Sequence, residues 1–262
     1  MMMRCPSLFL SHGMPTIALT PGRTGAFWER LGRDVGYPRA IVCISAHLEG
    51  SQPLVTVDPH PDTIHDFSGF PRALYDIQYP APGDPELARQ VIDRLSDAGF
   101  HAKPLKNRGL DHGVWVPLRH LFPRADIPVI QLSLQTAEPP KYHLALGQAM
   151  APLRDQGILI IGSGGATHDL SGMAGNRIDT PPADYAVAFD DWLADTIAQG
   201  KIEQLADYRR QAPQAERNHP YPADHFLPLL VAAGAAATQP VGTCLYRGFA
   251  YGVLSLAAYR WD

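Results

Sequence analysis

Residues 158–168 read Ile-Leu-Ile-Ile-Gly-Ser-Gly-Gly-Ala-Thr-His, and this stretch decides the fold class. The first four residues are branched and apolar with no polar alternation, which is typical of a strand buried on both faces of a mainly parallel sheet. The glycines that follow predict a turn that carries His168 to the sheet edge. Ligands bind at the carboxyl ends of the strands in an open α/β sheet. The stretch therefore predicts a buried strand together with a candidate site at its end.

Three further apolar runs have the same character and predict strands at residues 8–10, 40–45 and 128–134. Helical patterns lie between and after these runs. One of them opens at Asp84, a suitable N-cap followed by proline, and ends before Gly99. Others cover residues 141–155, 182–199 and 224–233, and the tail at 243–259 predicts one or two closing strands. This alternation predicts a single α/β domain over residues 1–262, with a mainly parallel or mixed central sheet flanked by helices on both faces.

Composition excludes several classes of protein. The chain has 262 residues, 45% of them hydrophobic and 18% charged, and a net charge of −4 without a Lys/Arg run. This pattern indicates a folded domain and disfavours a nucleic-acid partner. The longest near-apolar run, residues 226–237, is shorter than the roughly 20 residues of a membrane span. Residues 1–4 lack a signal peptide's apolar stretch and the three cysteines form no CxxC pair, so we expect a cytoplasmic protein.

Histidines follow three of the predicted strands directly. His12 comes after the run at 8–10, His47 after the run at 40–45, and His168 after the run at 158–161. Three strands therefore deliver one histidine each to the edge of the sheet where ligands bind. Two more histidines precede helical patterns: His112 beside a glycine, and His225 in a proline-stiffened segment that places it in the first turn of a helix.

Gathered imidazoles indicate a metal site. Imidazole suits Zn, Fe, Cu and Ni, and three protein ligands leave open positions for a substrate. The residues alone do not separate a non-haem Fe(II) centre from a catalytic zinc site. The chain has no HExxH and no GxSxG segment, which disfavours a zincin protease and a serine hydrolase.

Six segments in this order carry a resemblance to a known family: Ser11-His12-Gly13-Met14-Pro15, Ser45-Ala46-His47, residues 63–71 (TIHDFSGFP), residues 79–83 (YPAPG), Asp111-His112-Gly113 and residues 219–229 (HPYPADHFLPL). Together they resemble the extradiol aromatic ring-opening dioxygenases of the DOPA 4,5-dioxygenase type, in the class III, protocatechuate 4,5-dioxygenase B-subunit superfamily. The resemblance covers nearly the whole chain. It implies a single α/β domain with one metal ion.

The resemblance also implies roles for individual residues. The implied metal ligands are three histidines: His12, His47 and His225. His168 is implied as the acid/base residue, or as a fourth ligand in a zinc-loaded form, and His112 as a catalytic residue that lines the pocket and donates a hydrogen bond. Two further side chains are expected to bind substrate: His65 and Trp115.

The implied cofactor is Fe(II), because zinc has no redox change to offer to this chemistry. Zn(II) is expected to compete for the site in purified protein, since it lies above iron in the Irving–Williams order. The implied partners are a catechol and O2, and the state of oligomerisation stays open, a homo-oligomer included. Two alternatives use the same histidines: a zinc-dependent hydrolase or deaminase, and a non-catalytic binding protein with a structural metal.

Overall fold

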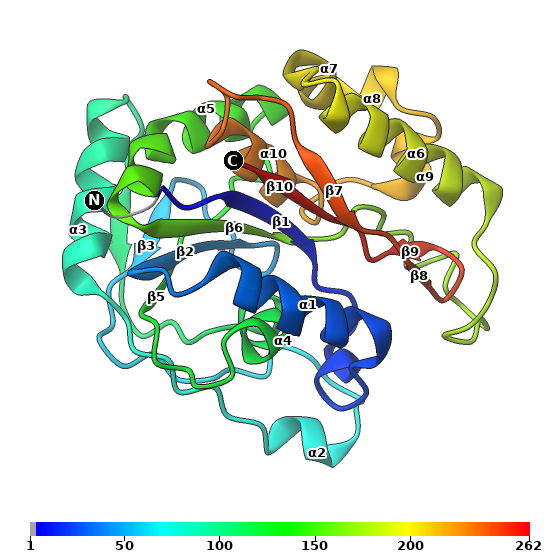
Figure 1. Cartoon of the computed structure of the whole chain (residues 1–262), viewed down its shortest axis with the longest axis horizontal. Coiled ribbons are helices and arrows are strands. Elements are labelled where there is room, and N and C mark those ends of the chain that lie inside the picture. Colours follow the sequence, from blue (N-terminus) through cyan, green and yellow to red (C-terminus); the bar gives the residue numbers. More distant parts are fainter. Residues whose placement is uncertain (1–3) are drawn as a thin grey trace.

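A six-stranded mixed sheet forms the centre of the molecule, with the strand order β5-β2-β6-β1-β10-β7 (Figure 1). The computed structural model describes residues 4–262; residues 1–3, on which part of the signal-peptide expectation falls, lie outside the described residues. The strands of the sheet are β1 (Ser7–Ser11), β2 (Ala40–Ser45), β5 (Val129–Gln131), β6 (Ile158–Gly164), β7 (Thr243–Tyr246) and β10 (Ala258–Trp261).

The direction of the strands changes at β1. Strands β5, β2, β6 and β1 pair in parallel, whereas β10 runs antiparallel to both β1 and β7. In the parallel part, Ser45 of β2 lies opposite Ser163 of β6, and Ser11 of β1 lies opposite Gly164. The carboxyl ends of these three strands are therefore level. The predicted α/β class with a mixed central sheet is confirmed.

Helices cover both faces of the sheet (Figure 1). The helices α3 (Pro85–Asp97), α5 (Pro140–Met150), α6 (Asp184–Ala198) and α10 (Leu227–Gly234) pack on one face, and α1 (Gly22–Val35) and α4 (His112–Leu121) on the other. Strand β2 shows why both faces must be covered, since Val42 enters the first core and Ile41 and Cys43 enter the second. Burial on both faces explains the unbroken apolar runs of the sequence.

Short elements complete the chain: η1 (Pro15–Ala18), β3 (Leu54–Thr56), α2 (Arg72–Tyr75), β4 (Lys103–Leu105), η2 (Ala151–Gln156), α7 (Ile202–Ala206), α8 (Tyr208–Gln211), α9 (Ala215–Asn218), β8 (Phe249–Ala250) and β9 (Leu254–Ser255). The N-cap at Asp84 is confirmed, because its carboxylate accepts a hydrogen bond from the Leu87 amide at 2.9 Å. Within residues 4–262, no helix combines the length and the apolar character needed to cross a bilayer.

Two details of the sequence prediction are wrong. The tail holds four short strands, because it folds into the small hairpin β8–β9 between β7 and β10. His225 lies in the turn before α10 and not in the first turn of that helix. The helix starts late because Ala223 adopts a left-handed φ of 60°, which reverses the chain before regular helical geometry begins at Leu227.

Candidate metal centre

Five histidines gather at the carboxyl ends of β1, β2 and β6: His12, His47, His112, His168 and His225. The His47 ring is central, with centroids 5.0 Å from His12, 4.0 Å from His112 and 5.0 Å from His225. The rings of His12 and His225 are 5.2 Å apart. The sequence prediction that His12, His47 and His168 share one edge of the sheet is confirmed by their placement.

The backbone holds this edge together. The amide of His12 donates to the carbonyl of Gly164 at 3.0 Å, and the amide of Gly165 donates to the carbonyl of His225 at 2.9 Å. A side chain on Gly164 would collide with that carbonyl of His225. A glycine is therefore required at residue 164 for the turn before α10 to reach the end of β6.

His12 is fixed in one tautomer by its surroundings. Its Nδ1 lies 3.0 Å from the hydroxyl of Ser163, and that hydroxyl donates its only proton to the carbonyl of Gly113. The hydroxyl must therefore accept a hydrogen bond from Nδ1–H, which leaves Nε2 of the neutral ring as a free lone pair. This lone pair points to Nε2 of His47, 3.2 Å away.

Asp66 fixes His112 and faces His47. Its carboxylate oxygens lie 3.0 Å from Nδ1 of His112, and one of them also accepts the His112 backbone amide at 2.9 Å. The other oxygen lies 3.6 Å from Nδ1 of His47. An ionised carboxylate can only accept hydrogen bonds. It therefore favours the Nδ1–H tautomer of both rings and leaves both Nε2 atoms unprotonated.

The tautomers of these rings decide whether the site can hold a metal ion. Two nitrogen lone pairs that face each other at 3.2 Å repel unless a cation or a proton lies between them. One ring nitrogen from each of His12, His47 and His112 lies within 4.8 Å of the others. Buried imidazoles that are held by Nδ1 and point Nε2 at a common space match the second-shell arrangement of metal-binding histidines. The donor set therefore fits a transition metal of the kind that imidazole prefers.

A second group joins the first from the opposite side: His168, Asp224 and His225. The rings of His168 and His225 are stacked, with centroids 3.4 Å apart and planes 9° from parallel. Asp224 places a carboxylate oxygen 3.2 Å from Nδ1 of His225, but within residues 4–262 this buried nitrogen makes no hydrogen bond. Asp224 is thus the side chain that faces this nitrogen of His225.

Burial keeps most of these rings neutral. It lowers the pKa of His12 and His225 well below the ordinary value, and the neighbouring histidines lower both further. The pKa of His47 falls to about 3 for the same reasons, although Asp66 opposes the shift. Burial also lowers the pKa of His168. At Asp66 burial alone would raise the pKa, but the bonds and charge of His112 outweigh it and lower the pKa to about 2. The cluster thus offers neutral imidazoles beside an ionised carboxylate, which is the form that binds a metal.

The two predicted substrate residues, Trp115 and His65, pack against the loop that carries Asp66. Trp115 is completely buried and donates its indole N–H to the carbonyl of Ile64 at 3.0 Å. His65 lies 3.1 Å from the carbonyl of Ile77 through Nε2, and its ring meets Trp115 edge-on at 5.7 Å. Both therefore support the loop that carries Asp66. Their role in substrate binding stays a prediction.

Sequence reasoning left the role of Asp66 unassigned and did not single out Ser163 or Asp224. A signal for Asp66 was present, since it belongs to the distinctive segment at 63–71. Its partner His112 is 46 residues away, and no local spacing reveals such a pair. Ser163 looked like part of a glycine turn, and only the pairing of β1 with β6 brings its hydroxyl to His12.

The fold and the cluster define a metal-dependent α/β enzyme whose centre lies at the carboxyl edge of its sheet. Residues 25–257 match the family described as the catalytic LigB subunit of aromatic ring-opening dioxygenase. The chain belongs to this family, and it is an extradiol ring-cleaving dioxygenase. The resemblance inferred from the sequence is confirmed.

Individual relatives agree with this assignment. The chain is 42% identical to a 4,5-DOPA dioxygenase extradiol of Beta vulgaris, over 97% of this chain and 96% of that protein. It is 38% identical to a protein of the same description from Escherichia coli K12, over 98% and 94% of the two chains. The crystal structure of an uncharacterized protein from Escherichia coli K12 superposes with a TM-score of 0.81 at 31% identity, covering 99% of this chain and all of the other.

Proposed function

We propose that this chain is an Fe(II)-dependent dioxygenase that opens the ring of a DOPA-like or related dihydroxyphenyl compound with O2 to give a semialdehyde, and that residues 1–262 form its single catalytic domain. The observation that carries the proposal is the facing pair of His12 and His47 Nε2 atoms, 3.2 Å apart, with Nδ1 of His12 bonded to Ser163 and Nδ1 of His47 facing Asp66. The relatives described as 4,5-DOPA dioxygenases support a catechol of this class.

The proposed ligands are His12, His47 and His225. Support for His225 comes from its centroid distances of 5.2 and 5.0 Å to the other two rings. His112, and not His225, belongs to the group whose ring nitrogens lie within 4.8 Å together with His12 and His47, while the family resemblance favours His225 as the third ligand and places His112 on the substrate side. Bound Fe(II) would supply a Lewis-acidic, redox-active centre for the catechol oxygens and O2; Zn(II) is the expected competitor.

His168 is proposed to accept a proton from one catechol hydroxyl. Its lowered pKa keeps the ring neutral near neutral pH, so a ring nitrogen is free to take the proton. The ring stacks on His225, which holds it beside the proposed ligand set. The same neutral ring could alternatively serve as a fourth ligand to zinc.

His112 is proposed to donate a hydrogen bond to a substrate oxygen. Its Nδ1–H is committed to Asp66, so only Nε2 is left for the substrate. Nε2 donates once it has received a proton from the substrate, and it can return that proton later in the reaction.

The test is O2 uptake after anaerobic reconstitution with Fe(II), using DOPA, caffeate and protocatechuate. Stoichiometric uptake with a yellow product, lost in His12→Ala and His168→Ala, supports the proposal and ranks the catechols. No uptake with any catechol, despite one tightly bound metal per chain, would overturn it in favour of a zinc-dependent hydrolase or deaminase. A cytoplasmic location stays a prediction.

The ligand set has its own test in the metal content of two variants. His225→Ala should lose most of the bound metal, whereas His112→Ala should retain it and lose turnover. The reverse result would exchange the roles of His112 and His225. Elemental analysis after dialysis against limiting Fe(II) under anaerobic conditions provides the measurement.

A further inference from the structure

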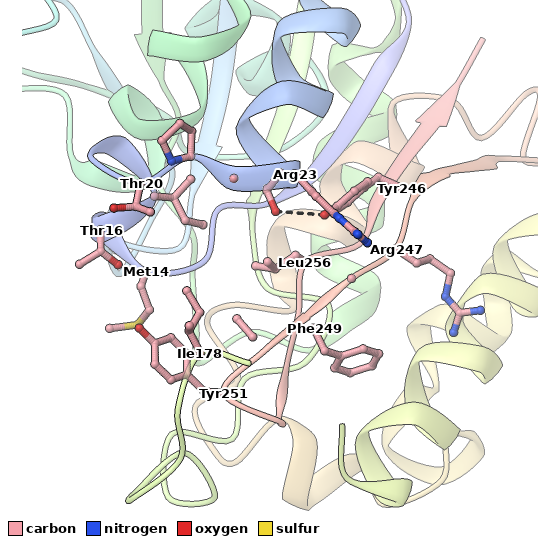
Figure 2. A pocket seen from close by; sticks show the side chains of 16 residues that line it. Met14, Thr16, Thr20, Arg23, Ile178, Tyr246, Arg247, Phe249, Tyr251 and Leu256 are labelled. Atoms are coloured by element: carbon pink, nitrogen blue, oxygen red, sulfur yellow. Dashed lines mark hydrogen bonds between the residues drawn. The ribbon is translucent and has the colours of Figure 1, made fainter. Parts of the chain in front are cut away.

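A cavity much larger than the space at the histidines lies beside the metal centre (Figure 2). Its volume is about 370 Å³, and it is bounded by residues 14–24 on one side and by the closing hairpin, residues 246–256, on the other. Its lining includes Met14, Arg23, Tyr246, Arg247, Tyr251 and Leu256. Nothing in the proposed chemistry of the histidines accounts for this space.

The space at the histidines is too small for a substrate. The cavity lined by His12, His168 and His225 has a volume of about 20 Å³. That is room for roughly one water molecule, whereas ligand pockets usually measure about 300–1,000 Å³. The bulk of a substituted aromatic ring must therefore lie in a neighbouring space.

The two cavities meet at Met14. This residue lines both of them, and it follows His12 by only two positions. Gly13, which lines the small cavity, lies against the wall of the large one, because a side chain on Gly13 would collide with Ile17 and Leu256, and both of these line the large cavity. A methionine side chain is unbranched and adapts its shape easily, so Met14 can make room for a ligand that extends from one cavity into the other.

The large cavity is apolar with a cationic end. Figure 2 shows Met14, Ile178 and Tyr251 at one end and Arg23 and Tyr246 at the other. Tyr246 is held in place by a 3.2 Å hydrogen bond with Thr24.

Arg23 is the arginine available to a ligand. Arg247, which also lines the cavity, forms ion pairs with Asp190 and Asp191. Arg23 forms no ion pair within residues 4–262. A guanidinium at the end of an apolar cavity is suited to a carboxylate, which it can bind through two parallel hydrogen bonds.

We propose that the large cavity binds the side chain of a catechol that carries a carboxylate, with that carboxylate on Arg23 and the ring directed past Met14 to the histidines. The inference rests on the proposed function, because it assigns the substituent of the same substrate. It makes Arg23 a specificity-determining residue that lies outside the histidine cluster. It also makes the closing hairpin a wall of the substrate site.

The kinetic test compares two catechols in three proteins. The catechols are 3-(3,4-dihydroxyphenyl)propanoate and 4-ethylcatechol, which lacks the carboxylate. Arg23→Gln should raise KM for the first by about tenfold or more, the usual loss for a charge-assisted pair, and leave KM for the second within twofold. The control is Arg30→Gln, since Arg30 is exposed on the same helix α1 and does not line the cavity. Equal changes with both catechols in Arg23→Gln would overturn the proposal.

A binding test does not depend on turnover. Phenylpropanoate has no hydroxyl groups to bind a metal, so its binding to metal-free protein reports on the large cavity alone. Ligand-observed NMR titration should give saturable binding to the wild type and to Arg30→Gln, and at least about tenfold weaker binding to Arg23→Gln. No saturable binding to the wild type, or equal binding to Arg23→Gln, would refute the assignment. If no catechol is cleaved by any of the three proteins, the proposed function fails, while this titration still decides the cavity.

Discussion

Buried polar groups lie at both ends of the parallel strands, and the two ends treat them differently. At the amino end, the fully buried guanidinium of Arg154 donates to the carbonyls of Cys5 at 2.8 Å, Ala235 at 3.1 Å and Trp261 at 3.1 Å. At the carboxyl end, His12 and His112 are held through Nδ1 by Ser163 and Asp66, and the Nε2 atoms of His12 and His47 face each other at 3.2 Å without a donor between them.

The difference between the two ends distinguishes a buried polar group that stabilises the fold from buried polar groups that can bind a ligand. A buried group that is fully satisfied by carbonyls from distant parts of the chain contributes to stability. Unsatisfied nitrogens that converge on one point lower stability in the absence of a ligand and create a place for one. A single unsatisfied atom does not have this meaning, since Nδ1 of His143 is also buried without a partner within residues 4–262. A binding site is indicated only where several such nitrogens point at one space.

The largest expected effect is at the carboxyl end. His12→Ala should lower ring cleavage by more than about 1,000-fold, because a proposed ligand to the metal is lost. Urea unfolding of the metal-free protein should change by less than about 2 kcal/mol, since the variant loses one neutral hydrogen bond to Ser163 and is also relieved of the facing Nε2 pair. Elemental analysis and O2 uptake measure the first effect. A metal-free variant that is destabilised as strongly as Arg154→Met would contradict the comparison.

The amino end should respond in the opposite way. Arg154→Met should lower the free energy of unfolding by about 3–5 kcal/mol, because three buried carbonyls lose their donor. The folded fraction should keep its turnover within twofold at low temperature. Arg4→Met is the matched control, since Arg4 makes one surface ion pair with Asp155 at 3.6 Å and should cost less than about 1 kcal/mol. Loss of turnover in fully folded Arg154→Met would show that the two ends are coupled.

Asp66→Asn tests whether the Asp66 carboxylate sets the tautomers of the histidines at the carboxyl end. An amide can present an N–H to His112 and no longer favours the Nδ1–H tautomer, so we expect a 10–100-fold loss of activity or metal affinity, the usual effect of a second-shell change. Asp62→Asn, on an exposed residue of the same loop, is the control. Wild-type activity of Asp66→Asn across pH 6–9 would rule out the positioning role.

The smallest effect concerns His143, a buried histidine outside the metal centre. Burial lowers its pKa to about 4 in the folded protein, so below pH 6.5 the unfolded chain binds more protons and stability falls as the pH falls. His143→Gln should reduce the loss of stability between pH 7 and 5.5 by about 1 kcal/mol. His60→Gln, on an exposed histidine, should leave this loss unchanged. Urea unfolding of the metal-free proteins at the two pH values provides the measurement, and identical losses in His143→Gln and wild type would contradict the expectation.

The sheet was largely predictable because burial on both faces leaves a clear sequence pattern. The predicted run at 40–45 coincides with β2, and the run at 158–161 is the first part of β6. The amphipathic helix α1 was not singled out, and the strands β3 and β4 were missed because three residues are too few to show a period.

The histidines were predictable because a strand followed by a histidine is a local feature. Their partners were not, because Asp66 meets His112 and Ser163 meets His12 only through the tertiary fold. The start of α10 was predicted three residues early for a similar reason. The left-handed backbone of Ala223 depends on the surrounding packing and has no glycine or asparagine to announce it.

The antiparallel direction of β10 places two different parts of the chain at the site: the strands that carry the histidines and the hairpin that precedes β10. Because β10 runs against β1, the hairpin that precedes it returns to the same edge as the histidines without belonging to the strands that carry them. Residues 248, 249 and 251, which line the large cavity and are only partly buried, can thus change while β1, β2 and β6 keep their register. This arrangement lets evolution, or a directed library confined to that hairpin, retune which aromatic compound is accepted while the reaction itself is conserved.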